Sequence, residues 1–149
     1  TIATLYERIE HLGFALVAKY LPGLATGSVV LREQDESKRR VFPQRSPEDG
    51  RIDWDNSGEA IYNFIRAQTR PYPGAFTSWE GKDLKVWSAR KFADIDGSEA
   101  RIGQILDSSD KLLVQTGDGI LELLELSLEN QDISASEFLK ITGPVILGS

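Results

Sequence analysis

Short hydrophobic segments separated by turn residues fill the second half of the chain, and they constrain the fold more than any other feature. They lie at residues 75–79, 84–92, 101–107, 111–116 and 120–128. Segments of this length and spacing are typical of antiparallel strands, and the turn residues at 80–83 indicate a hairpin between the first two. This half of the sequence therefore predicts a small β-barrel.

Helical periodicity is found on both sides of these strands. The first predicted helix opens the chain and ends at Pro22-Gly23, because proline cannot continue a helix. Its apolar face consists of Ile2, Leu5, Ile9, Leu12, Leu16 and Tyr20. A second helix is predicted at about 57–68, where Asp55, Asn56 and Ser57 supply cap-type residues and Glu59 lies three positions after Asn56. A short closing helix is predicted at 134–138, where the same spacing recurs.

A stiff passage joins the second helix to the first strand. Pro71 biases the residue before it away from helical geometry, and Pro73-Gly74 adds a turn. We expect this passage to set the angle between the helix and the barrel. Residues 41–54 show little periodicity and predict a long loop. The tail at 144–149 gives no clear signal.

Composition limits the chemistry that the chain can perform. Its 149 residues include no cysteine, which excludes disulfides and thiol catalysis. The single histidine, His11, lies away from the apolar face of the first helix, so we interpret it as a solvent-facing residue. A site built from several histidines around a metal is excluded. No apolar run approaches the ~20 residues that span a membrane and no signal peptide is visible, so cytoplasmic residence is the default expectation.

Charge is distributed unevenly along the chain. Residues 1–70 carry ten basic and ten acidic side chains, whereas residues 71–149 carry seven basic and thirteen acidic ones. Nucleic-acid binding depends on lysines and arginines that neutralise phosphates. The acidic excess therefore argues against nucleic acid as a partner of the barrel region. Four basic residues nevertheless cluster in one predicted hairpin, namely Lys82, Lys85, Arg90 and Lys91.

Several motifs occur in one order along nearly the whole chain. They are QDESKRRVFPQRSPEDGRIDW, IYNFIRA, PYPGAFTSWEGKDLKVWSA, TGDGILELLEL and SASEFL. In this order they resemble the C-terminal half of the formyl-tetrahydrofolate-dependent formyltransferases. That family includes methionyl-tRNA formyltransferase and the N-formyltransferases of nucleotide-linked amino sugars.

The resemblance implies a particular organisation of the chain. Residues 1–35 would be an α/β remnant, the last helix and strand of a Rossmann-like catalytic domain. Residues 36–70 would form a connecting loop and helix. Residues 71–149 would form a small open β-barrel related to the OB fold, in agreement with the periodicity described above.

The resemblance also implies that the reactive groups lie outside this chain. In the family, an asparagine and a histidine lie in an H-x-S-L-L-P region and an aspartate follows, all before the helix that opens this chain. We therefore assign no catalytic residue and no metal, and we expect the chain alone to be inactive. The parent enzyme would move a formyl group from formyl-tetrahydrofolate to an amine, with the cofactor held mainly by an N-terminal domain.

Five residues are candidates for positioning a substrate: Arg45, Trp54, Asn63, Arg66 and Tyr72. Arg45 offers a planar donor fork that suits phosphate, although most loop arginines are simply exposed. Trp54 could stack on a base or sugar, or pack against the start of the second helix. Asn63 and Arg66 lie on one side of that helix, where they could face a cleft or form a domain-interface hydrogen bond. Tyr72, between two prolines, suits a stacking platform and a packed linker equally well.

Three other features have plainer interpretations. Trp79 and Trp87, on adjacent predicted strands, are interpreted as a cross-strand pair in the core, although such a pair can also stack bases. The glycine-rich segment 117–119 joins two strands and is interpreted as a turn. A solvated face is expected for the acidic side chains Glu122, Glu125 and Glu129.

Three functions follow, in order of preference. The first is part of an N-formyltransferase that acts on a nucleotide-linked amino sugar, because the acidic barrel disfavours tRNA. The second is part of methionyl-tRNA formyltransferase, with tRNA as the partner. The third is a non-catalytic OB-like binding module, which is disfavoured because residues 1–35 alone would expose apolar surface. No membrane partner is expected.

Overall fold

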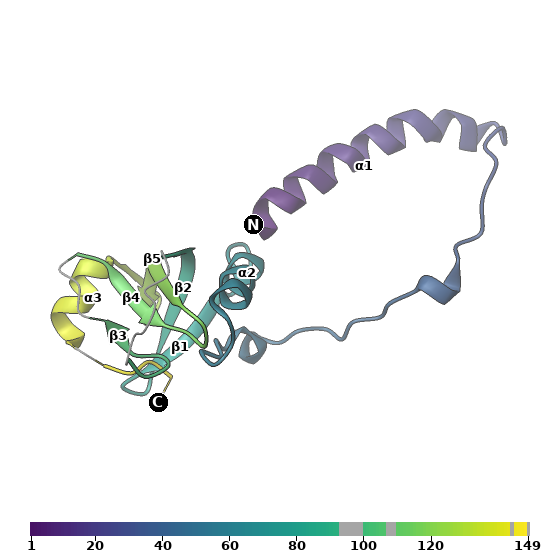
Figure 1. Cartoon of the computed structure of the whole chain (residues 1–149). Coiled ribbons are helices and arrows are strands. Elements are labelled where there is room, and N and C mark those ends of the chain that lie inside the picture. The colour runs from purple at the N-terminus through teal and green to yellow at the C-terminus, as the bar shows by residue number, and fades with distance from the viewer. Residues whose placement is uncertain (93–99, 107–109, 144, 149) are drawn as a thin grey trace. The chain divides into compact units, whose positions relative to one another are not determined.

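The computed structural model describes residues 1–92, 100–106, 110–143 and 145–148. They form two compact units, residues Thr1–Ile2 with Pro47–Ser149 and residues Ala3–Ser46. Figure 1 shows the first unit as a sheet with two helices and the second as a long helix followed by extended chain.

An antiparallel sheet forms the body of the larger unit. Its strands are β1 (Ala75–Trp79), β2 (Lys82–Lys91), β3 (Ile105–Leu106), β4 (Leu112–Gln115), β5 (Ile120–Leu128) and β6 (Gln131–Ile133). They pair in the order β1-β2-β5-β4-β3, and β6 pairs with β5. Figure 1 shows the sheet curled on itself as a half-barrel. The prediction of a small barrel-like sheet is confirmed at this level.

The β1–β2 hairpin follows from the residues of its turn. Trp79 pairs with Lys82, so only Glu80 and Gly81 connect the strands. Both have positive φ, 49° and 74°, which is the geometry whose twist matches that of paired strands. The predicted hairpin is confirmed, and its second strand begins two residues earlier than expected.

Helices α2 (Gly58–Gln68) and α3 (Ala135–Thr142) pack on the sheet and complete the core. α2 contributes Ile61 and Ile65, which are buried. α3 contributes Phe138, whose ring meets that of Trp79 edge-on with centroids 5.3 Å apart. Full burial of a side chain of this size contributes about 1.5–3 kcal/mol, so these few contacts hold both helices on the sheet.

The two helix caps depart from the prediction in one detail. At α3 the capping box forms as expected, with Ser134 and Glu137 each bonded to the other's backbone N–H. At α2 the cap is Ser57, whose hydroxyl accepts from the N–H of Ala60 at 3.2 Å. Asn56 is not the cap because its side chain donates to Asp53. The helix therefore begins one residue later than predicted.

Three features at the end of the barrel differ from the prediction or were not predicted. Within the described residues, the strand expected at 101–107 is only β3, because Gly103 has a φ of 77° and turns the chain. The short strand β6 is missed, since three residues give little periodic signal. The tail without a clear signal packs here. Leu147 is buried, and its N–H donates to the carbonyl of Gly103 at 2.8 Å.

Helix α1 (Ile2–Ala25) dominates the smaller unit, and it continues past the predicted stop at Pro22-Gly23. Proline lacks one N–H donor, but the last turn still forms because Thr26 N–H donates to the carbonyl of Pro22. The helix ends at Ala25, and Gly27 just beyond it has a φ of 68°. Hydrogen bonds from Gly27 and Ser28 back to the last turn complete a glycine-terminated Schellman motif.

The smaller unit buries little of its apolar surface. Residues 1–35, expected to include the last strand of a catalytic domain, form no strand, because a strand needs a hydrogen-bonded neighbour and none of the described residues pairs with them. α1 buries none of its residues, and His11 is exposed as expected. The exposed apolar side chains include Leu5, Ile9, Leu12 and Leu16. Within the described part of the chain, no helix is long and apolar enough to cross a membrane.

Gly117 provides a test of how the barrel holds the segment before α2. A Cβ atom here would lie 2.2 Å from the carbonyl oxygen of Asp55, and Gly117 N–H donates to the carbonyl of Asn56 at 3.0 Å. We expect Gly117→Ala to lower the free energy of unfolding in urea by about 1–3 kcal/mol, the usual cost of forcing atoms into a packed site. Gly119→Ala is the matched control, because nothing lies within 4 Å of its Cβ position. Equal losses from both variants would contradict this assignment.

Candidate functional site

The outward side of α2 carries a row of polar contacts. Asn63 Nδ2 donates to Glu59 Oε1 at 3.1 Å, and Arg66 donates to Asn63 Oδ1 at 3.2 Å. Residues three and four apart share one side of a helix, which is why these side chains meet. The Arg66 guanidinium also lies over the ring of Tyr62, 5.1 Å from its centroid. Lys91 of β2 forms a salt bridge with Glu59.

Just beyond α2, a closed ring of contacts holds Arg70 on the barrel. Its guanidinium lies 4.2 Å from the centroid of the Trp87 ring on β2 and 3.2 Å from the carboxylate of Asp132 on β6. Trp87 Nε1 donates to Ser127 Oγ at 2.7 Å, and Ser127 donates to Asp132 at 2.6 Å. Because each member of the ring contacts the next, the Arg70 side chain has a defined position.

Two groups of cation–ring contacts thus occur here, Arg66 over Tyr62 on α2 and Arg70 with Lys85 at Trp87 on β2. We refer to Tyr62, Arg66, Arg70, Trp87 and Lys85 as the cation–aromatic track. Lys85 Nζ lies 5.7 Å from the Trp87 ring centroid. Among the described residues, Arg66 and Lys85 form no salt bridge, so both charges can serve a negatively charged partner. Cations interleaved with accessible rings are typical of surfaces that bind single-stranded nucleic acid.

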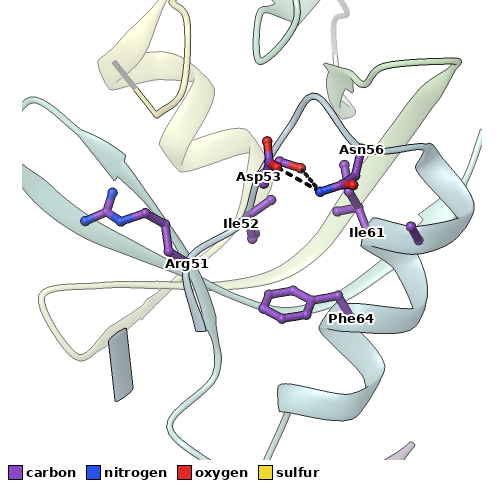
Figure 2. Close-up of a pocket in the computed structure, with 7 residues that line it drawn as sticks. Arg51, Ile52, Asp53, Asn56, Ile61 and Phe64 are labelled. Carbon is purple, nitrogen blue, oxygen red and sulfur yellow. Dashed lines mark hydrogen bonds between the residues drawn. The ribbon is translucent and has the colours of Figure 1, made fainter. Parts of the chain in front are cut away.

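A small pocket of about 200 Å³ opens between α2 and the residues that precede it. Figure 2 shows its apolar side chains, Ile52, Ile61 and Phe64. Asn56 Nδ2 donates to the Asp53 carboxylate at 3.0 Å, and Arg51 donates to Ser78. The pocket is smaller than the ~300–1,000 Å³ of usual small-molecule sites, and these polar groups are bonded within the protein. We therefore interpret it as a surface depression that orders the start of α2.

The N-terminus of α2 is fixed by a residue that sequence reasoning missed. An Asp118 carboxylate oxygen accepts from the N–H of Gly58 at 2.7 Å, across 60 positions of sequence. A carboxylate suits this place because the first N–H groups of a helix lack partners and the helix dipole favours negative charge. The sequence feature that could have indicated this cap is the acidic residue between two glycines at 117–119. The turn itself is confirmed, but its contact with α2 is long-range and leaves no local pattern.

Residues 45–143 match the family described as "Formyl transferase, C-terminal domain". The chain belongs to this family. The resemblance that the motifs indicated is therefore confirmed. Similar proteins include the methionyl-tRNA formyltransferase of Solibacter usitatus, 37% identical over 132 residues, and that of Lactococcus lactis, 33% identical over 124 residues.

The chain spans less than half of the length of these relatives. The match covers 88% of the chain but 41% of the Solibacter protein, and 83% of the chain but 38% of the Lactococcus protein. The crystal structure of HypX from Aquifex aeolicus in complex with tetrahydrofolic acid aligns with a TM-score of 0.61. That alignment covers 85% of the chain and 23% of HypX at 19% identity, which shows a common fold.

The formyl transferase C-terminal domain brings two of the five predicted substrate-positioning residues together. Asn63 and Arg66 bond to each other on α2. Tyr72 lies two positions beyond Arg70 and is 39% exposed. Trp54 is only 5% exposed and its Nε1 donates to Thr77 Oγ1 at 3.0 Å, so its ring is occupied by the core and does not serve as a stacking surface. Arg45 is an exposed residue of the smaller unit.

The two strand tryptophans do not form the predicted cross-strand pair. Strand register pairs Trp79 with Lys82 at the end of the hairpin. Trp79 lies in the core, whereas Trp87 is half-buried and contacts Arg70. The prediction of core packing is thus confirmed for Trp79 and wrong for Trp87, since residues on adjacent strands meet only if register places them opposite each other.

The acidic residues of β5 also divide between two environments. Glu125 and Glu129 are exposed, as predicted for a solvated face. Glu122 is buried, and its carboxylate lies 2.6 Å from Nε of Arg90 on β2. The prediction is wrong for Glu122, because the neighbouring strand supplies the cation that makes its burial tolerable.

Glu59 provides a pH-dependent test of the polar row on α2. Hydrogen bonds from Lys91 and, secondarily, from Asn63 lower the pKa of the Glu59 carboxyl from its ordinary value of 4.5. A carboxyl whose pKa is lowered by folding contributes stability above its ordinary pKa, and this contribution is lost as pH falls through the folded-state pKa. We expect NMR titration of the side-chain carboxyl to place the Glu59 pKa below 4.5.

Lys91→Met removes the larger cause and should raise the Glu59 pKa toward its ordinary value. Lys85→Met is the matched control, because it removes an equal charge from the same strand without a salt bridge to Glu59. A Glu59 pKa that does not move in Lys91→Met would show that the salt bridge does not persist in solution.

Proposed function

We propose that this chain is the C-terminal portion of a methionyl-tRNA formyltransferase, which transfers a formyl group from formyl-tetrahydrofolate to the amine of methionyl-tRNA. One observation carries the proposal. Relatives of that name from four bacteria align with 83–95% of the chain at 30–37% identity. The order of the motifs and the cation–aromatic track support the same substrate.

This proposal reverses the order that net charge suggests, in which a nucleotide-linked amino sugar ranks before tRNA. Net charge misleads because it does not record where on the surface the charges lie. Glu122, Glu129 and Asp132 each form a salt bridge with a cation of β2 or the linker. These pairs leave the net charge unchanged, but a partner at the track meets Arg66 and Lys85, which form no salt bridge among the described residues.

The segment before the barrel adds positive charge that a count of the barrel omits. Residues 38–45 contain Lys38, Arg39, Arg40 and Arg45 and no acidic residue. The first two form salt bridges with nearby carboxylates, whereas Arg40 and Arg45 form none among the described residues. We assign this segment and the track to phosphate contacts with tRNA, which keeps Arg45 in its predicted role.

The proposal includes a division of the chain into three parts. Residues 1–35 are the edge of a Rossmann-like catalytic domain, residues 36–70 connect it, and residues 71–149 form the OB-like barrel. The exposed apolar side of α1 supports the first assignment, because Leu5 and Ile9 are more than half exposed at 51% and 52%. An adjoining domain would cover them.

The pocket beside α2 does not fit the cofactor. The pocket beside α2 holds only about 200 Å³, and its polar groups are bonded within the protein. In this proposal formyl-tetrahydrofolate binds to the catalytic domain and supplies the formyl group there. The present chain contributes binding and orientation of the tRNA through Arg66, Asn63 and Tyr72, and no proton transfer is assigned to it.

Activity of the chain alone tests this division of labour. Mixed with formyl-tetrahydrofolate and methionyl-tRNA, the purified chain should give no formylated product above the protein-free rate, because it carries no matching Asn-His-Asp set. Transfer of radiolabelled formyl groups to the tRNA provides the measurement. Turnover would place the reactive groups in this chain and overturn the assignment.

Binding distinguishes the two candidate substrates. We expect the chain to bind initiator tRNA with an affinity that falls steeply with salt, because each phosphate contact releases counterions. The double variant Arg40→Gln/Arg45→Gln should reduce the slope of log Kd against log salt by about 2, roughly one per contact. Lys140→Gln, on α3, is the control and should leave the slope unchanged. Binding of a nucleotide-linked amino sugar without binding of tRNA would contradict the proposal.

A further inference from the structure

A groove of about 360 Å³ lies beside the Arg70–Trp87 contact. Arg70 and Trp87 line it together with Leu124 and Glu125 of β5 and Asp132 of β6. We propose that this groove binds one unpaired guanine base of an RNA ligand. The inference rests on the proposed tRNA substrate and goes beyond it, because it assigns a base-reading site.

The first element of the site is a fixed stacking surface. Arg70 lies on the Trp87 ring at 4.2 Å and is held there by Asp132. Its side chain is nevertheless 55% exposed, which leaves part of the guanidinium free to contact a ligand. Unstacked bases of RNA commonly stack on arginine guanidinium planes and aromatic rings. A flat base therefore fits the open side of this pair.

The second element is the exposed apolar side chain of Leu124 on β5, which lies where β5 has no partner strand on one edge. β4 pairs with β5 as far as Leu123, and β6 pairs with it only from Leu126 onward. Leu124 and Glu125 lie between these two partners, and Leu124 is 41% exposed. A base placed over Leu124 would remove apolar surface from water, which is favourable.

The third element selects the base. Glu125 forms no hydrogen bond or salt bridge among the described residues, whereas Asp132 is already engaged by Arg70 and Ser127. An ionised carboxylate only accepts hydrogen bonds, and its two oxygens can accept a pair of parallel donors. Guanine presents two adjacent donors, an N–H and an amino group, on its Watson–Crick edge. Adenine presents an acceptor beside its amino group there, so the carboxylate favours guanine.

The charges of the groove determine which part of a nucleotide enters it. Glu125 and Asp132 are negative and repel a phosphate from the interior. Lys85, whose Nζ lies 5.7 Å from the Trp87 ring centroid, forms no salt bridge among the described residues and can meet the phosphate attached to a bound base. The site therefore suits a nucleotide with its base inside and its phosphate outside, and it does not suit free phosphate.

Tryptophan fluorescence provides a direct readout. Trp54 and Trp79 are buried, whereas half-buried Trp87 lines the groove. We expect GMP to quench the emission of the full chain saturably. AMP and CMP should bind about tenfold more weakly, because their bases lack the two adjacent donors of guanine. Inorganic phosphate should have no effect. Trp87→Phe should abolish the response to GMP.

Two variants test the assigned contacts. Glu125→Gln should weaken GMP binding about tenfold and remove the preference over AMP, and the exposed position of Glu125 favours normal folding. Arg70→Lys keeps the charge but removes the planar stacking surface, so it should weaken all nucleotides alike. Lys111→Gln, which alters another cation–ring contact over Phe92, is the control and should bind GMP normally. Circular dichroism confirms that each variant is folded.

The outcomes separate this inference from the proposed function. If the chain binds tRNA in a salt-dependent manner but neither GMP nor tRNA changes the Trp87 emission, the groove is not a base site and the inference is overturned. It is also overturned if an arginine-rich peptide saturates the signal and GMP does not. Quenching by GMP without tRNA binding would support the groove and refute the tRNA substrate.

Discussion

The attachment of α2 to the barrel is the constraint on which the rest of the site depends. Asp118 holds the start of the helix through the N–H of Gly58 at 2.7 Å, and Arg70 holds the chain just beyond its end through Trp87 and Asp132. Buried Ile61 and Ile65 fix the apolar side between these points. With both ends and one side fixed, the polar row on α2 has a single orientation relative to β2, and the cation–aromatic track can be a defined surface. A helix held by its apolar side alone could fray at either end and lose this order.

The structure also shows where the charges of this domain lie, which its total charge does not. A net count gives no position for any charge, whereas salt bridges across the sheet and from the linker place several carboxylates directly beside cations. Glu122 is the extreme case, since its side chain is only 8% exposed beneath Arg90. Exposed pairs contribute little stability, about 0–1 kcal/mol, yet they lower the local field that a phosphate meets. The distribution of unpaired cations is therefore the informative quantity, and only the structure reveals it.

Sequence patterns predicted the elements of this fold whose signals are local. Turn residues gave the β1–β2 hairpin, and Ser134 with Glu137 gave the start of α3. Long-range contacts left no comparable signal. The cap from Asp118, the packing of Leu147 and the opposite environments of Trp79 and Trp87 depend on register and on residues far away in the chain. The stop at Pro22-Gly23 was wrong for a related reason, because a proline near the end of a helix removes one donor without preventing the last turn. Of the candidate site, Asn63 and Arg66 were predictable from helical spacing, whereas the ring around Arg70 required the sheet.

The two proposed contact regions differ in the kind of recognition that their chemistry permits. Arg40 and Arg45, in an exposed segment with no acidic neighbour between positions 38 and 45, can attract any phosphate backbone. Contacts of this type give affinity and position a nucleic acid but carry no sequence information. The groove at Trp87 has the opposite character, since Glu125 and Asp132 repel phosphate while the open face of Arg70 accepts a flat ring. A surface that is basic in one place and acidic with stacking groups in another can bind RNA in general and still discriminate among bases. In this proposal, the acidic residues that first counted against tRNA as a partner supply the discrimination among bases.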